Sequence, residues 1–139
     1  MIKLIIGKKG SGKTKMLIDK VNSSVANTSG NVVCIEKGMN LTLDIDHKVR
    51  LIDADEYSIT SYESFFGFVN GILSGDYDIK EIFVDGILRI GCKKDGSKDY
   101  DGLGDLLERL YKQVPADVVL TFTVSADQTE LPGSVLKFS

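Results

Sequence analysis

The amino-acid sequence predicts a single α/β domain, built as a three-layer α/β/α sandwich around a mainly parallel sheet of about five strands. Short apolar runs of strand length alternate with segments whose apolar residues recur at helical spacing, and this alternation is typical of a parallel sheet covered on both faces. The chain has 139 residues, which lies within the commonest range of domain sizes. No repeat or linker-like segment divides it, so we expect residues 1–139 to form one domain.

Five short apolar runs have the length of buried strands, and they cover residues 2–6, 32–36, 48–52, 81–85 and 118–124. A glycine-rich loop follows the first run, and Lys13–Ser23 then predicts a helix with Leu17 and Val21 on its apolar face. Residues 37–47 are ambiguous, because their alternating apolar residues suggest a short edge strand or one arm of a hairpin.

A second helix has clear start and stop signals. Thr60 and Glu63 fit a capping box, in which each side chain accepts a hydrogen bond from the backbone N–H of the other residue. Phe65, Phe68 and their apolar neighbours recur at helical spacing, which makes this helix an element of the core. Gly75 ends it.

A third helix is predicted over Leu103–Val114, where leucines recur at helical spacing and Pro115 marks the end. Residues 91–102, directly before it, are rich in Gly, Lys and Asp. Because the lysines and aspartates nearly balance, an exposed flexible loop is favoured there over a lid or a partner-contact loop. The tail from Leu131 predicts a short helix or a final strand.

Residues 7–14 read GKKGSGKT and match the pattern G-x-x-x-x-G-K-[ST], directly after the first strand and before the first helix. In this context the glycines let successive backbone N–H groups turn inward, and the helix N-terminus receives an anion. The lysine reaches the β- and γ-phosphates, and the threonine hydroxyl binds Mg²⁺. We therefore predict that a nucleoside triphosphate contacts Gly7, Lys8, Lys9, Gly10, Ser11, Gly12, Lys13 and Thr14.

This octet resembles the Walker A motif of P-loop NTPases. The resemblance implies the P-loop NTPase fold, a Mg²⁺–nucleotide ligand and an acidic residue at the end of another strand. It indicates a superfamily and a class of ligand, but it does not identify a substrate. Val33–Glu36 resembles the strand that carries the catalytic base in RecA-like ATPases, which favours that branch of the superfamily.

Asp85 is the candidate metal ligand that would accompany Thr14. Ile82–Val84 lead into this acid at the carboxyl end of a predicted strand, the edge at which open α/β sheets bind ligands. A carboxylate there would hold Mg²⁺ through water, because Mg²⁺ dehydrates reluctantly. In the large ATPase branch of the family a glutamate follows this aspartate and orients the attacking water. Gly86 stands there instead, which argues against fast hydrolysis.

Two further residues are candidates for catalytic roles beside Lys13. Glu36 ends the second strand and would replace the missing base, with Asp55 and Glu56 as alternatives after the next strand. Arg89 lies four residues after Asp85, the candidate metal ligand, and would stabilise charge on the γ-phosphate. The simpler alternatives are a solvated strand end for Glu36 and a salt-bridged surface role for Arg89.

The nucleotide is expected to be ATP. The sequence contains no Asn-Lys-x-Asp element for guanine, and Leu88 stands where a resemblance to GTPases would require glycine. Asp127, after the last strand, is a candidate for reading a ring nitrogen of the base, with a plain turn as the alternative. Adenine needs no such motif, because stacking and backbone contacts bind it. We therefore expect Mg²⁺ with ATP.

Composition narrows the setting in which the protein works. The formal net charge of −3 gives no general attraction to nucleic acid or anionic membranes. No apolar run approaches the ~20 residues that span a bilayer, and the first run is too short for a signal peptide. Cys34 and Cys92 lack the spacing of metal ligands. We expect a reduced, cytoplasmic protein that does not bind membranes or nucleic acid.

Three classes of function fit these observations: a small, slow ATPase or ATP-dependent switch, a small-molecule or nucleotide kinase, and a non-hydrolysing ATP-binding module. Kinases clamp two phosphorylated ligands with several arginines, and this chain has only Arg50, Arg89 and Arg109, which weakens the kinase hypothesis. The family resemblance also implies a site completed at a subunit interface, by a second copy of the chain or a protein partner.

Overall fold

All five strands lie in one sheet and pair in parallel, in the order β1-β5-β4-β2-β3. The structure is a computed structural model that describes residues 1–139. Its strands are β1 (Ile2–Gly7), β2 (Asn31–Glu36), β3 (Arg50–Asp53), β4 (Ile79–Asp85) and β5 (Val119–Ser125). Its helices are α1 (Lys13–Asn27), α2 (Tyr62–Gly75), α3 (Ile87–Ile90), α4 (Tyr100–Gln113), α5 (Gly133–Leu136) and a 3₁₀ turn η1 (Gln128–Glu130).

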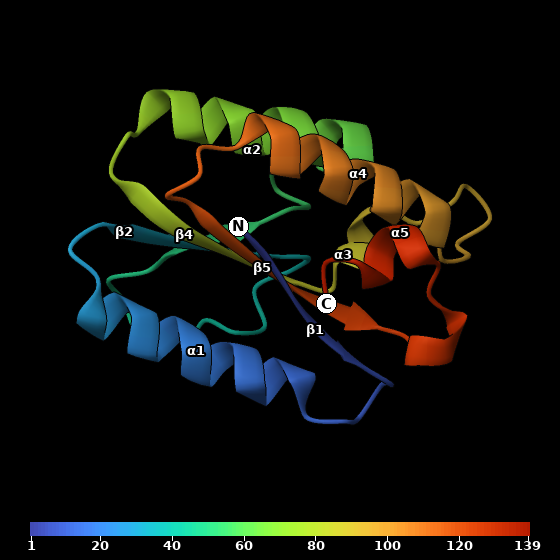
Figure 1. Ribbon diagram of the computed structural model, residues 1–139. Helices are drawn as coiled ribbons and strands as arrows, with labels where there is room; N and C mark the ends of the chain where they lie inside the picture. Colours follow the sequence, from blue (N-terminus) through green and yellow to red (C-terminus); the bar gives the residue numbers. More distant parts are fainter.

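Helix α1 covers one face of the sheet, and α2 and α4 cover the other (Figure 1). The larger core lies on the α2 and α4 side, where the rings of Phe65 and Phe122 pack edge to face. The smaller core surrounds Leu17 and Val21 of α1, both fully buried. Burial on both faces explains why the strands are continuous apolar runs. The predicted three-layer sandwich with a five-stranded parallel sheet is confirmed.

The strand order brings the predicted site residues to one edge. Strand β5 lies between β1, which leads into the glycine-rich loop, and β4, which ends at Asp85. Gly7 is the register partner of Ser125, while Glu36 pairs with Asp85 on one side and with Asp53 on the other. Because parallel strands end together, their carboxyl edge carries both the glycine-rich loop and a row of three acids.

Residues 37–47 form turns, so the edge strand or hairpin arm suggested by the sequence is wrong. The backbone N–H groups of Asp44 and Ile45 both donate to the Leu41 carbonyl oxygen, at 3.0 and 3.1 Å. Leu41 and Ile45 are buried against the α1 core, whereas Leu43 is 97% exposed. The alternating leucines therefore belong to a tight turn that buries positions four residues apart.

The capping box of α2 is made by different residues from those predicted. Ser61 is the N-cap; its hydroxyl accepts from the Ser64 backbone N–H at 3.0 Å, and the Ser64 hydroxyl accepts from the Ser61 N–H at 3.0 Å. Glu63 instead accepts hydrogen bonds from the guanidinium of Arg109 on α4. Helix α2 begins after Ser61 rather than Thr60, so Ser64 and not Glu63 is the third residue of the helix and completes the capping box.

Other helix boundaries also differ from the sequence prediction. Helix α4 begins at Tyr100, because the Asp99 side chain accepts from the Gly102 N–H at 2.9 Å and caps the helix earlier than expected. Helix α3 was not predicted. The tail forms the short helix α5, one of the two alternatives, and contains no strand.

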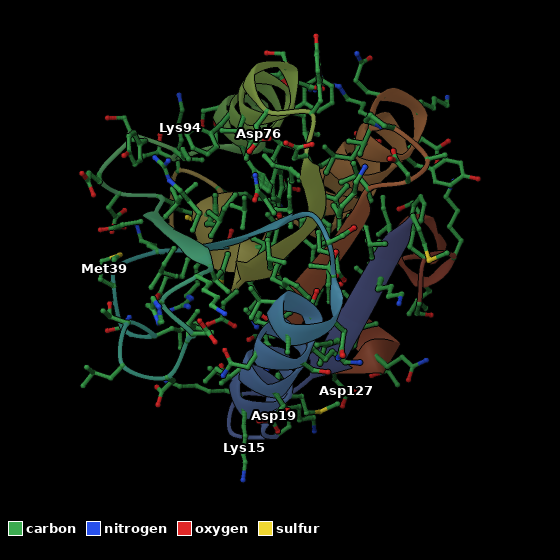
Figure 2. The ribbon with its side chains drawn as sticks, turned by 90° about the vertical axis from the view of Figure 1, so that its left-hand side faces the viewer. Lys15, Asp19, Met39, Asp76, Lys94 and Asp127 are labelled. Carbon is green, nitrogen blue, oxygen red and sulfur yellow. The ribbon has the colours of Figure 1, made fainter.

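Lys15 projects from the outer side of α1 into solvent (Figure 2). None of the helices combines the length and apolar composition needed to cross a membrane.

Candidate nucleotide-binding site

The glycine-rich loop connects the end of β1 to the start of α1 in a tight turn. Gly10 and Gly12 have φ angles of 83° and 86°, a region that residues with a Cβ atom rarely adopt. A Cβ atom at Gly7 would collide with the Ser11 hydroxyl. The Ser11 backbone N–H donates to the Lys8 carbonyl oxygen at 3.1 Å, which closes the turn. The positive φ angles favour glycine at positions 10 and 12, and the close approach of Ser11 favours it at position 7.

Lys13 is the first residue of α1, and only 7% of it is exposed. Its ammonium group donates to the Lys8 carbonyl oxygen at 3.0 Å and has no carboxylate within ion-pair distance. Burial lowers the pKa of Lys13; the nearby charge of Asp85 raises it, and the charge of Lys98 lowers it further. The loop thus holds a desolvated cation beside a helix N-terminus, where an anion is favoured.

Asp85, at the end of β4, is held by residues from two neighbouring elements. The Thr123 hydroxyl on β5 donates to Asp85 Oδ1 at 2.8 Å, and the Thr14 hydroxyl on α1 lies 3.5 Å from the same oxygen. The Gly86 backbone N–H donates to the Thr123 hydroxyl at 2.7 Å. Asp85 is 7% exposed and Thr123 1%. The orientation of Asp85 is therefore fixed by a buried hydrogen-bond chain.

The hydroxyl of Thr14 and the carboxylate of Asp85 suit a magnesium ion. Mg²⁺ prefers oxygen ligands and keeps several waters, so one or two protein oxygens beside a phosphate are sufficient. The protein has no cluster of three or more His, Cys, Asp or Glu side chains that could hold a metal alone. A divalent cation between Thr14 and Asp85 would therefore need oxygens from a bound phosphate or from water.

A cavity of about 540 Å³ lies at this edge of the sheet. It is lined by residues of the glycine-rich loop, the ends of β2, β4 and β5, helix α3 and the loop before α4. Asp85 is the only acid among the lining residues. The basic residues that line it are Lys9, Lys13, Lys37, Arg89 and Lys98. A strongly positive cavity therefore lies within a chain of net charge −3.

Glu36 lies next to Asp85 across the β2–β4 pair but does not line the cavity. It is 1% exposed, and its two carboxylate oxygens accept the backbone N–H groups of Asn40 and Leu41, at 3.2 and 2.9 Å. Burial raises the pKa of Glu36; the two N–H donors oppose this shift, and Asp85 and Asp53 add to it. In this arrangement Glu36 anchors the turn after β2, and it is not a solvated strand end.

Of the remaining predicted residues, Arg89 lines the cavity and Asp127 lies outside it. Arg89 lines the cavity, and its guanidinium is 3.9 Å from the Asp85 carboxylate. Asp127 does not line the cavity: one of its oxygens accepts from the Thr129 N–H at 3.0 Å, and the other lies 3.2 Å from the Lys8 ammonium. These contacts lower the pKa of Asp127 to about 2, the Thr129 N–H first among them.

The two alternative acids after β3 are also placed outside the cavity. Asp55 pairs with the Lys37 ammonium at 2.7 Å, and Glu56 is exposed. Neither residue lines the cavity.

No family model and no curated protein matches the sequence. Among solved structures, the chain is similar to the flagellar accessory protein FlaH from Methanocaldococcus jannaschii, with a TM-score of 0.61 and 14% sequence identity. The two share a fold. The match covers 98% of this chain and 65% of that chain, so this chain spans less than two thirds of the length of FlaH. At this identity the likeness shows the fold alone, and the fold agrees with the one that the glycine-rich octet implies.

Sequence reasoning missed several residues of the cavity. Lys37 directly follows the acid that ends β2, and the rule that ligands bind at the carboxyl edge would have included it. Thr123 is one of two threonines inside strand β5, and a hydroxyl residue in a buried strand is a signal of a buried polar contact. Cys92 and Lys98 also line the cavity, but nothing in their sequence context indicates on which side of the loop they lie.

Proposed function

We propose that the chain binds Mg²⁺ with ATP at residues 7–14 and acts as a slow ATPase or an ATP-dependent switch. The observation that carries the proposal is the positive cavity at the carboxyl edge of the sheet. It combines a desolvated Lys13, a helix N-terminus and one hydrogen-bonded carboxylate, Asp85. A phosphate chain with a divalent cation matches this set of charges.

The chain's own groups divide the work of binding. The backbone N–H groups of the glycine-rich loop and the ammonium of Lys13 bind the phosphates, while Thr14 and Asp85 offer oxygens to the metal. Magnesium, when bound, neutralises charge on the β- and γ-phosphates. Arg89 also faces this cavity and supplies a further positive charge.

Slow turnover is proposed because no free carboxylate is available to activate water. Gly86 follows Asp85 with a φ of 75° and begins α3, so a glutamate there would be strained. Glu36 is the nearest candidate base, but both of its oxygens accept backbone N–H groups of the following turn. Glu36 would act as a base only after the turn at Asn40 and Leu41 releases it. Such a step would couple hydrolysis to a conformational change, as a switch requires.

The experiment that tests this function measures ATP turnover over a series of protein concentrations, alone and with a panel of nucleosides and metabolites. The proposal predicts saturable Mg²⁺-dependent ATP binding with slow turnover that needs no acceptor. Turnover per chain that rises with concentration would support a site completed by a second copy. ADP release that depends on an acceptor would replace the proposal with a kinase, and absence of ATP binding would end it.

Asp85→Asn separates the metal role from phosphate binding. The variant is expected to lose most of the Mg²⁺ dependence of ATP binding while it keeps the phosphate contacts of the loop. Equal Mg²⁺ dependence in the variant and the native chain would remove Asp85 from the metal site.

A further inference from the structure

Lys98 places an ammonium group beside the glycine-rich loop, although it comes from the loop between α3 and α4. It lines the positive cavity, and its Nζ donates to the carbonyl oxygen of Ser125 at the end of β5. Ser125 is the register partner of Gly7, the first residue of the octet. Three segments distant in the sequence thus bring Lys98 and Lys13 into one cavity.

Neither of these two lysines is neutralised. No carboxylate lies within 4.0 Å of the ammonium of Lys13 or of Lys98. The two are close enough for the charge of Lys98 to lower the pKa of Lys13. Of the other basic side chains of the cavity, Arg89 faces Asp85 and Lys37 faces Asp55, whereas Lys9 is exposed and has no carboxylate partner. Two unpaired like charges in one cavity repel each other, and a ligand with several negative charges removes that repulsion.

The loop that carries Lys98 is folded on itself. The Lys93 N–H donates to the Ser97 carbonyl oxygen at 2.8 Å, and the Ser97 N–H and hydroxyl donate to Asp95 Oδ1 at 2.9 and 2.6 Å. Asp99 caps α4. These acids hold the loop's backbone and do not line the cavity. The loop is nearly neutral in composition, yet it presents Lys98 alone among its charged residues to the site.

We propose that Lys98 binds the phosphate chain of the nucleotide together with Lys13, so that a single chain supplies both ammonium groups. The proposal rests on the nucleotide binding proposed above and adds a second phosphate-binding residue to it. The loop over residues 91–99 then acts as one wall of the phosphate site.

Lys94 is a matched control for Lys98. It has the same side chain in the same loop and is exposed, but it does not line the cavity. Figure 2 shows Lys94 at the opposite side of the molecule from Asp127, the residue that pairs with Lys8 of the octet. Lys98→Gln and Lys94→Gln therefore remove the same charge from the protein, and only the first removes it from the cavity.

The test is a calorimetric titration of the full chain and its variants with Mg²⁺–ATP and with inorganic tripolyphosphate, which has no base or sugar. Loss of a hydrogen bond from a charged group predicts that Lys98→Gln weakens binding of both ligands about tenfold or more. Lys94→Gln is expected to stay within about twofold of the native chain, and Lys98→Arg to restore most of the affinity, because the charge is kept. Equal thermal unfolding of both Gln variants confirms that the fold is intact.

Equal affinities of Lys98→Gln and Lys94→Gln, in a native chain that binds Mg²⁺–ATP, would overturn the role of Lys98 and leave the proposed function standing. A native chain that binds neither ligand would overturn both.

Discussion

The hydroxyl of Thr123 donates to Asp85 Oδ1 at 2.8 Å and accepts the backbone N–H of Gly86 at 2.7 Å, so one buried side chain fixes both the end of β4 and the start of α3. Strand β5 lies directly between the strand of the glycine-rich loop and the strand of Asp85. A residue that binds no ligand in our account therefore sets the position of the only acid in the cavity.

Replacing Thr123 by valine removes this link while keeping the shape of the side chain. The change leaves the buried Gly86 N–H without a partner, and an unsatisfied buried group costs about 1–3 kcal/mol. We expect Thr123→Val to lower the free energy of unfolding by that amount and to weaken the Mg²⁺ dependence of ATP binding. Thr123→Ser keeps the hydroxyl and is expected to restore the Mg²⁺ dependence. Urea unfolding of Thr123→Val that matches the native chain would contradict the assigned contact.

Lys13 is expected to bind phosphate at the expense of stability. Burial lowers its pKa, so the folded state disfavours the charged form. This penalty is present at neutral pH and disappears as the pH rises past the ordinary lysine value of about 10.4. We predict that Lys13→Met raises the free energy of unfolding of the ligand-free protein by about 1 kcal/mol. Lys15→Met, on the outer side of α1, is the control and should change it little. Equal stability of the two variants would argue against a desolvated ammonium at Lys13.

Glu36 gives the stability of the protein a defined pH dependence. Burial raises its pKa, so the folded state binds the proton more tightly than the unfolded state does. The stabilising effect of the protonated form is complete below the ordinary value of about 4.3 and is lost as the pH rises through the raised pKa. We predict that the stability of the native chain, relative to Glu36→Gln, falls as the pH rises from about 4 towards neutrality. Denaturant unfolding across that range measures the difference, and parallel profiles for the two proteins would refute the assignment.

The two cysteines differ in reactivity, and only Cys92 reports on the cavity. Burial raises the pKa of Cys34 to about 12, so its thiol stays protonated and unreactive in the folded protein. Cys92 is exposed and lines the cavity. We expect a thiol reagent to modify Cys92 alone in the native chain, and saturating Mg²⁺–ATP to slow that reaction. The variant Cys92→Ser should show no fast thiol. An unchanged rate of modification with nucleotide bound would place the ligand elsewhere.

The sheet and the glycine-rich loop were predictable because their signals are local. Buried parallel strands are short apolar runs, and the octet at Gly7–Thr14 forms its turn with glycines at positions whose positive φ other residues rarely adopt. The carboxyl edge of the sheet then indicated Asp85. These inferences needed only neighbouring residues and the general rule for parallel strands.

The helix boundaries and the remaining cavity residues were not predicted, because they depend on contacts that a short stretch of sequence does not reveal. The capping box of α2 is one residue later than predicted, at Ser61 and Ser64, and Glu63 instead accepts from Arg109 on another helix. Helix α3 was missed because its apolar residues continue the pattern of β4, and only the positive φ of Gly86 separates the two elements. The direction of Lys98 depends on hydrogen bonds within its loop, which composition does not reveal.

Nucleotide binding at the glycine-rich loop is decided by a calorimetric titration of the native chain and of Lys13→Met with Mg²⁺–ATP, with Lys15→Met as the control. We predict saturable binding of one nucleotide per chain by the native protein and by Lys15→Met. Loss of the Lys13 contacts should weaken binding by Lys13→Met about a hundredfold. A native chain that shows no heat of binding, or a Lys13→Met variant that binds as tightly as the native chain, would contradict this prediction.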